Sequence, residues 1–549
     1  MNGERQIVTE DRRPITDNRG HPSSFIIQRS SFRFLLSVVS GVLLFACFPL
    51  LNAHALVWVA TVPLLVAVVG ERRLGRAYLL GALAGAVFLA GSVYWFTFVM
   101  AHYGGMPEGL ALAVMVPFLA VFSSFWGLFG LVECWMARRS PALALAAAPF
   151  LWVSLELART YYFITGFPWN LLGYAVQPTG LRQLASVTAV YGLSWIAVAT
   201  SALGASVPLL RKRRRPLAIA LLAWCIMLAA ANRALAPLPL PPATDTAVLV
   251  QPNVPLNEAA DDWAPWKNPA PLERLISLSI ASLPRPASAS ATLDGAPGTP
   301  PLIVWSENSA PFYFNRDPVF RKAVESMARQ AHAYAVVGAV DFSGPGETLP
   351  RNSAVALDPS GSVILRYDKI RLVPFGEYVP AWAAAVAGKI TSEAGDFVPG
   401  TNYESAATPR GKIGVFICYE AIFPQLVRRL TPPGPGVLVN ISDDGWYGDS
   451  SAAFQSLEMA RLRAIENRRY LLRATNDGIT AVIDPYGRVL GRLPRHEQAV
   501  LPAHFSFIGA RTFYSAHGDV FAWLCVVASG LVVAFRGLGR RPRALATKD

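Results

Sequence analysis

The sequence has few charged residues and few cysteines, and both shortages limit what kind of protein it can be. Of its 549 residues only 15% are charged, 53% are hydrophobic, and the mean hydropathy is positive. That composition is too apolar for one soluble domain, so it indicates a membrane part joined to a globular part. Cys418 is the single cysteine of the polar region, so we expect no disulfide framework there. The other four cysteines all lie in strongly apolar segments: Cys47, Cys134, Cys225 and Cys525.

Several common signatures are also absent. The chain has no internal repeat, no glycine-rich phosphate loop and no cluster of metal-ligating side chains, and its seven histidines are scattered. We therefore expect no metal, no cofactor and no nucleic-acid partner. The first 30 residues are polar and basic, and they lack the apolar core and cleavage site of a signal peptide. We predict that residues 1–31 form a cytoplasmic tail.

Long apolar runs fill the chain from Phe34 to Arg233, and most approach the ~20 residues that a helix needs to cross a bilayer. The second run is short, which makes it a candidate for a tilted or distorted segment. These runs predict a membrane domain of about seven helices over 32–235, and a last membrane helix with a basic cytoplasmic tail over 513–549. The seven runs and the later eighth are 34–51, 55–70, 77–100, 109–136, 142–159, 185–209, 217–234 and about 519–536.

Basic residues alternate along the loops. The loops after runs one and three, 52–54 and 101–108, contain no Lys or Arg. Cytoplasmic loops are enriched in Lys and Arg, so this alternation predicts that both termini lie inside the cell and that the polar region lies outside. The clusters after runs two, four, six and eight are Arg72, Arg73 and Arg76; Arg138 and Arg139; Arg211, Lys212 and Arg213 to Arg215; and Arg536, Arg540, Arg541 and Arg543.

The loop at about 160–184 is longer than the others and rich in aromatic residues between Tyr161 and Tyr174. Two interpretations stay open: an aromatic belt that anchors the protein at the membrane interface, and a loop that touches substrate beneath the outer domain. Glu133 and Glu156 lie within or near apolar runs. Ionisable groups are costly there and suggest function, although both could be snorkelling or paired.

The polar region follows a stiff proline-rich connector, Leu235 to Pro242. Residues 236–512 change to short strands and amphipathic helices, which suits one α/β domain. Residues 284–300 are of low complexity and are predicted to be a flexible loop. We predict helices at 318–332, 420–430 and 452–468, and strands at 247–251, 301–305, 335–340, 353–357, 363–367, 413–417, 436–441, 470–474 and 480–483.

Three reactive side chains come at the ends of apolar strands: Glu307, Lys369 and Cys418. Ligands of α/β proteins bind at such ends. Cys418 also precedes a predicted helix, whose N-terminus would favour the thiolate. Glu307 could act as a general base, and Lys369 could stabilise the oxyanion of a tetrahedral intermediate. Each residue alone could be structural, but the three together predict nucleophilic catalysis.

At these residues the sequence resembles the nitrilase, or carbon–nitrogen hydrolase, superfamily. Over about 32–540 it resembles the apolipoprotein N-acyltransferase family, in which membrane helices carry an outward nitrilase-like domain. The block from Lys369 to Pro380 is the most specific part of the match. The other matching motifs are Gly166-Phe-Pro-Trp169, Gln251-Pro-Asn253-Val-Pro255, Trp305-Ser-Glu307, Cys418-Tyr419-Glu420 and Asn440-Ile-Ser-Asp-Asp-Gly-Trp446-Tyr-Gly448.

The resemblance implies an α-β-β-α sandwich and a role for each matching residue. It implies that Glu307 is the base, Lys369 the oxyanion residue and Cys418 the acylated nucleophile. Ser306 stands where the family often has proline, and the low-complexity loop also departs from the family pattern. The resemblance further implies supporting or substrate-binding roles for Glu377, Tyr419, Glu420, Trp446 and one of two loop tryptophans, Trp263 or Trp266.

The implied reaction has two steps. Cys418 takes an acyl chain from a membrane phospholipid, and the α-amine of an S-diacylglyceryl cysteine at a lipoprotein N-terminus then receives it. The implied setting is the bacterial inner membrane, with the catalytic domain on the periplasmic side. Two alternatives remain: a membrane-anchored amidase that gives the acyl group to water, and a transporter or scaffold. The second would show matching helix breaks in two halves of the chain, and no clear pair occurs.

Overall fold

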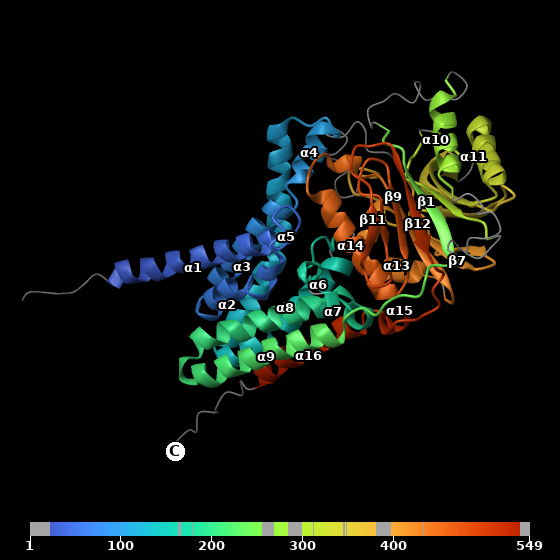
Figure 1. Ribbon diagram of the computed structural model, residues 1–549. Coiled ribbons are helices and arrows are strands. Elements are labelled where there is room, and N and C mark those ends of the chain that lie inside the picture. Colours follow the sequence, from blue (N-terminus) through green and yellow to red (C-terminus); the bar gives the residue numbers. More distant parts are fainter. Residues whose placement is uncertain are drawn as a thin grey trace, which may run out of the picture.

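The structure is a computed structural model that describes residues 22–162, 166–177, 179–254, 268–283, 299–310, 312–343, 346, 348–379, 397–431 and 433–538. The calls on Trp263, on Trp266 and on most of the low-complexity loop and the two tails lie outside these residues. Figure 1 shows a helical part beside a part built on β-sheets, with α14 (Ala452–Asn467) at their junction.

The helical part is built from the predicted apolar runs. Five segments are long and apolar enough to span a membrane: α3, α5, α6, α8 and the stretch Arg211–Ala234 that contains α9. The chain therefore fits a multi-pass membrane protein. The elements of this part are α1 (Pro22–Ala46), η1 (His54–Trp58), α2 (Val62–Val69), α3 (Leu74–Ser92), α4 (Trp95–His102), α5 (Glu108–Ala137), α6 (Pro141–Tyr161), η2 (Leu172–Ala175), α7 (Thr179–Arg182), α8 (Ala185–Leu209), η3 (Arg211–Arg213), α9 (Arg214–Ala234) and, late in the chain, α16 (Val520–Leu538).

The structure corrects two details of the predicted runs and confirms one. The run at 34–51 leaves helix after Ala46, and the run at 77–100 is divided between α3 and α4. The second break exposes the carbonyl of Ser92, which accepts a hydrogen bond of 3.0 Å from Gln455 Nε2 on α14. A helix break at this depth is tolerated because another part of the protein satisfies the freed carbonyl. The short second run is distorted as expected, since it forms η1 followed by α2.

The other part contains two six-stranded sheets. Their orders are β12-β1-β2-β3-β4-β5 and β11-β10-β9-β8-β7-β6, with parallel pairing of β1, β2 and β3 and of β7, β8 and β9. The strands are β1 (Asp245–Gln251), β2 (Leu302–Trp305), β3 (Tyr334–Ser343), β4 (Leu349–Leu357), β5 (Val363–Asp368), β6 (Ala406–Thr408), β7 (Gly411–Ile417), β8 (Gly436–Ser442), β9 (Leu471–Thr475), β10 (Ala481–Ile483), β11 (Val489–Arg492) and β12 (Ala499–Phe505).

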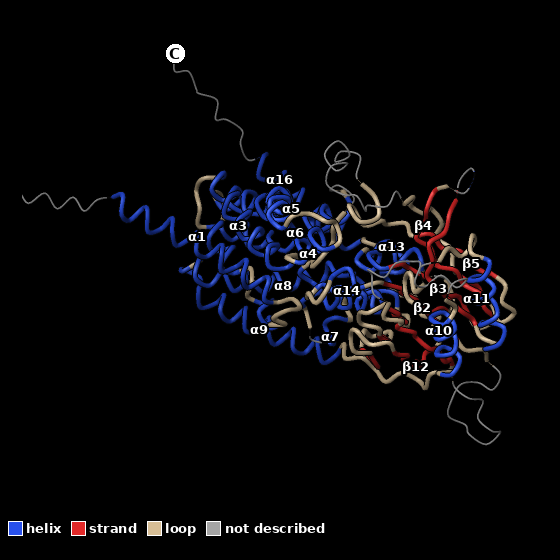
Figure 2. The backbone as a smooth tube through the Cα atoms, turned by 90° about the horizontal axis from the view of Figure 1, so that it is seen from above, coloured by secondary structure: helices blue, strands red, loops and turns tan. Residues whose placement is uncertain are grey.

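The two sheets pack face to face between layers of helices. Successive side chains of a strand point to opposite faces. Val304 of β2 therefore joins the core that faces the second sheet, whereas Ile303 joins the core beneath α10 (Ala270–Ala281) and α11 (Pro318–Ala331). On the second sheet, α13 (Pro424–Leu430) packs on β7 and α14 packs on β9. Figure 2 shows the strands gathered at the end of the molecule away from α1. This layering is the α-β-β-α sandwich that the resemblance implied.

All nine predicted strands are present, and α11 and α14 match their predictions within a residue. The helix predicted at 420–430 is wrong at its start. A 3₁₀ turn, η6 (Cys418–Ile422), follows β7, and α13 begins only at Pro424, where the fixed φ of proline suits the first turn. The missed elements are α10, α15 (Phe513–His517) and the edge strands β6, β11 and β12.

Candidate active site

Three strand ends converge at the gap between the sheets. Glu307 lies two residues beyond β2, Lys369 follows β5, and Cys418 follows β7. Two antiparallel steps, β3 to β4 and β4 to β5, turn β5 into the same direction as β2, so their carboxyl ends share one edge. All three side chains are buried, and Lys369 Nζ lies 3.0 Å from Glu307 Oε1. The structure thus brings together the residues that the sequence singled out.

Glu377 completes a buried charge network with these residues. Lys369 Nζ lies 2.9 Å from Glu377 Oε1, and Val373 N donates to Glu377 Oε2 at 2.7 Å. Asn352 Nδ2 donates to both carboxylates, to Glu307 at 2.7 Å and to Glu377 at 2.6 Å. Sequence reasoning missed Asn352. The available signal was a polar amide in the otherwise small and apolar second half of β4.

The backbone fixes the second oxygen of the Glu307 carboxylate. Asp443 N, just beyond β8, donates to Glu307 Oε2 at 2.9 Å. Both oxygens of this carboxylate therefore have donors, which favours its charged form and holds its orientation. Burial, Glu307 and Asp477 together raise the pKa of the Asp443 side chain well above its usual range.

Lys369 keeps its charge inside the protein. Burial lowers the pKa of its ammonium, but Glu307 and Glu377 outweigh burial and hold that pKa well above the usual value. A buried ammonium between two carboxylates is a fixed positive centre. It can bind a developing oxyanion without reorganising when the reaction occurs.

Cys418 does not have the environment that the sequence suggested, and the thiolate prediction is wrong. Burial and the charge of Glu307 raise the pKa of its thiol above the usual value, although Lys369 opposes them. No α-helix starts at Cys418, so no helix dipole offsets its burial. Cys418 also has a positive φ of 49°, a strained conformation that clusters at functional sites. The nucleophile is thus a thiol at rest and needs a base to become reactive.

Glu420 holds two of the three strand ends in place. Its Oε1 accepts hydrogen bonds from Ile370 N at 2.7 Å and from Arg371 N at 3.0 Å, beside Lys369. Its Oε2 accepts one from Ile417 N at 2.8 Å, beside Cys418, and Tyr367 donates its hydroxyl to both oxygens. Burial raises the pKa of Glu420 to about 7. This carboxylate therefore fixes the distance between nucleophile and ammonium from behind.

Aromatic side chains surround the nucleophile. Tyr419 is buried against Phe423, with ring centroids 5.2 Å apart. Trp446 is 42% exposed, and its ring lies 4.9 Å from that of Tyr103, which follows α4. The Trp446 side chain thus stands at the outer rim of the site, where the two parts of the protein meet.

The aromatic loop at about 160–184 lies at this junction as well. Trp169 is buried, donates from Nε1 to Gln455 Oε1 at 2.7 Å, and lies 6.1 Å from the ring of Tyr447. Charges on Cys418 raise the pKa of Tyr447 after the effect of burial, which places Tyr447 near the nucleophile. The anchor-belt interpretation is wrong for Trp169, because the ring lies inside the protein and not at a lipid interface.

The two acidic residues of the membrane part have different surroundings. Glu133 on α5 is fully buried, and neither carboxylate oxygen has a hydrogen-bond partner among the described residues. Glu156 on α6 accepts hydrogen bonds from Trp152 Nε1 at 3.0 Å and from Leu172 N at 2.8 Å. Snorkelling is excluded for both side chains because both are buried. No group of three or more His, Cys, Asp and Glu side chains in the described part of the chain is placed to hold a metal ion.

The fold and this site define a class of protein before they define a family. Residues 287–511 match the carbon–nitrogen hydrolase family, and residues 40–203 match the apolipoprotein N-acyltransferase N-terminal domain. A solved structure of an amidase from Nesterenkonia sp. aligns with 52% of this chain and 95% of its own, at 18% identity and a TM-score of 0.35. The site is accordingly that of a carbon–nitrogen hydrolase domain joined to a membrane domain.

Curated relatives narrow the class to a family. An apolipoprotein N-acyltransferase of Geobacter metallireducens is 37% identical over 91% of this chain and 94% of its own length. One of Methylococcus capsulatus is 31% identical over 91% of this chain and 96% of its own. The chain belongs to the apolipoprotein N-acyltransferase family.

Proposed function

We propose that this protein moves an acyl chain from a membrane phospholipid to the α-amine of an S-diacylglyceryl cysteine at a lipoprotein N-terminus, through a thioester on Cys418. The observation that carries the proposal is the buried Glu307–Lys369–Glu377 network at the strand ends that also hold Cys418. The relatives named apolipoprotein N-acyltransferase support the choice of substrates.

The first half of the reaction forms the thioester. Glu307 takes the proton of the Cys418 thiol, and Sγ attacks the ester carbonyl of the phospholipid. The oxyanion that develops is stabilised by the Lys369 ammonium. The tetrahedral intermediate then breaks its bond to the glycerol oxygen, which receives the proton from Glu307 and leaves in a lysophospholipid.

The second half transfers the acyl group to the amine. The neutral α-amine attacks the thioester carbonyl while Glu307 accepts a proton from nitrogen. Collapse of this intermediate releases Cys418 as a thiolate, which takes the proton back from Glu307. Both halves use the same base and the same positive centre, because the chemistry of each half is acyl transfer at a carbonyl.

We further propose the domain division 1–31, 32–235, 236–512 and 513–549, with the catalytic domain on the periplasmic side of a bacterial inner membrane. The alternating basic loops support this orientation. A reporter that is active only outside the cytoplasm should score positive when it is fused after residue 250 and negative after residue 213. The reverse pattern would contradict the orientation.

An amidase has the same need for a base, a positive centre and a thiol, so the acceptor must be tested directly. Purified protein should be incubated with acyl-labelled phospholipid and a diacylglyceryl-cysteine peptide, either with a free α-amine or with that amine acetylated. We expect labelled amide on the free peptide alone, with slow release of fatty acid to water. Rapid release of fatty acid that ignores the free peptide would favour the amidase.

A further inference from the structure

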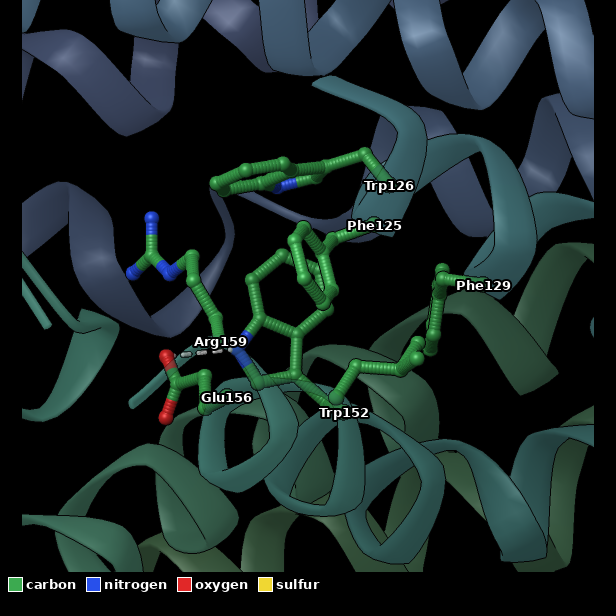
Figure 3. A pocket seen from close by; sticks show the side chains of 7 residues that line it. Phe125, Trp126, Phe129, Trp152, Glu156 and Arg159 are labelled. Carbon is green, nitrogen blue, oxygen red and sulfur yellow. Dashed lines mark hydrogen bonds between the residues drawn. The ribbon is translucent and has the colours of Figure 1, made fainter. Parts of the chain in front are cut away.

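A pocket lies in the membrane part, between α5 and α6, and none of the candidate catalytic residues lines it. It encloses about 270 Å³ of space free of protein atoms, part of it open to the surroundings. Figure 3 shows four aromatic side chains together with one acid and one base. The lining residues are Phe125, Trp126, Phe129, Trp152, Leu155, Glu156 and Arg159.

The two charged residues of this pocket have unused hydrogen-bonding capacity. Arg159 and Glu156 are only 2% and 7% exposed. Neither Arg159 Nη1 nor Glu156 Oε2 has a hydrogen-bond partner among the described residues. In Figure 3 the guanidinium lies between the Trp126 ring and the Glu156 carboxylate. A buried polar atom without a partner costs roughly 1–3 kcal/mol, so a pair of them points to a bound group that is both an acceptor and a donor.

The aromatic walls fix the direction in which the guanidinium can bind. The guanidinium carbon of Arg159 lies 5.1 Å from the centre of the Trp126 ring. A guanidinium stacked on a ring is held by cation–π attraction and presents its N–H edge, which suits phosphate oxygens. The Glu156 oxygen beside it suits an N–H or O–H donor, whereas Phe125, Phe129 and Leu155 offer only apolar surface.

The polar end of the pocket lies at the depth of lipid headgroups. Arg159 and Glu156 are two and five residues before the end of α6 at Tyr161, so they lie roughly 3 and 8 Å below that end at 1.5 Å per residue. That end of α6 leads into the loop beneath the α/β domain, because Phe167 N donates to Arg159 O at 3.0 Å. A lipid of that leaflet would reach these two residues with its head and the aromatic walls with its chains.

We propose that this pocket is a phospholipid-binding site separate from the catalytic site, which takes the phosphate on Arg159 and an N–H donor of the headgroup on Glu156. The class of ligand is a glycerophospholipid with a primary ammonium headgroup. Bound lipid would stabilise the loop above it, because Glu156 also holds Leu172 N at 2.8 Å and the same loop carries Trp169 to the catalytic domain. The proposal does not depend on the proposed acyl transfer.

Photolabelling tests the site directly. Full-length Cys418→Ala protein in dodecyl maltoside micelles, which contain no phosphate, should be given phosphatidylethanolamine with a diazirine on one acyl chain. The matched probe is diacylglycerol with the same chain. Labelled positions are mapped by mass spectrometry on α5 and α6, and on α9, whose exposed apolar residues Ile219, Leu222 and Ile226 report non-specific contact.

We expect phosphatidylethanolamine to label α5 and α6 at least about tenfold more than diacylglycerol does, relative to α9, as charge-assisted hydrogen bonds of roughly 1.5–3 kcal/mol imply. Arg159→Met should remove this preference, and Arg159→Lys should keep part of it. Equal labelling by both probes in the protein with Arg159 intact would overturn the proposal and leave water as the partner of the two groups. Retention of the preference in a folded Arg159→Met variant would overturn it as well.

Discussion

Buried charges occur in both parts of this protein, but their partners differ. In the α/β domain, Lys369 contacts two carboxylates, and both oxygens of Glu307 accept hydrogen bonds. In the membrane part, Arg159 and Glu156 share one pocket and each keeps an atom without a partner in the described chain. A fully satisfied network is rigid and suits chemistry that must not reorganise, whereas an incompletely satisfied pair suits a ligand.

The comparison is broken most severely by removing the centre of the satisfied network. Lys369→Met should lower turnover by about 10²–10³ because the oxyanion loses its positive centre. It should also destabilise the domain by about 3–5 kcal/mol, because two buried carboxylates lose their counter-ion. Turnover is measured with labelled phospholipid and acceptor peptide, and stability by thermal unfolding.

A second change separates these two effects. Adding Glu377→Gln to Lys369→Met removes one of the uncompensated charges, so the double variant should regain thermal stability but no turnover. Recovery of turnover in the double variant would mean that Lys369 acts only by balancing charge.

Glu420 offers a smaller effect with a pH signature. Its pKa of about 7 means that protonation below that pH withdraws the acceptor for Ile370 N and Ile417 N. We expect kcat to fall as pH drops through about 7, and Glu420→Gln to have a kcat lowered roughly tenfold without this limb. The exposed Glu404→Gln is the matched control and should behave as the unmodified protein.

The same group has a calculable effect on stability. The folded-state pKa of Glu420 is raised from 4.5 to about 7, so the folded protein binds more protons than the unfolded chain between those values. Its contribution to stability is complete below about pH 4.5 and is lost as pH rises through about 7. Thermal unfolding of Glu420→Gln should lack this pH dependence; an unchanged dependence would assign it to another group.

Glu133 gives the smallest expected effect and sharpens the comparison within the membrane part. Its carboxylate is as unsatisfied as that of Glu156, but it lines no described pocket. Glu133→Gln keeps the volume of the side chain and loses no hydrogen bond, so turnover and lipid labelling should stay within about twofold. A large loss of either would show that an unsatisfied carboxylate here has a role outside the pocket.

The sequence predicted the strands of the sandwich well because their interiors are continuous apolar runs, as in β2 and β8. It missed β11 and β12, whose exposed residues give no clear periodicity. At the site it found the residues at strand ends and missed Asn352, which is brought to Glu307 only by sheet pairing. The state of Cys418 was wrong because burial is a tertiary property that local sequence does not determine.

The most direct test of the account is the mass of the protein after exposure to phospholipid without acceptor. The account predicts one added acyl chain on Cys418, removable by neutral hydroxylamine, absent from Cys418→Ser and unaffected by Cys225→Ser, since Cys225 is exposed on α9. Adding the diacylglyceryl-cysteine peptide with a free amine should discharge the chain into an amide. N-acylated peptide formed with no competent thioester detectable, even under rapid quenching, would contradict the account.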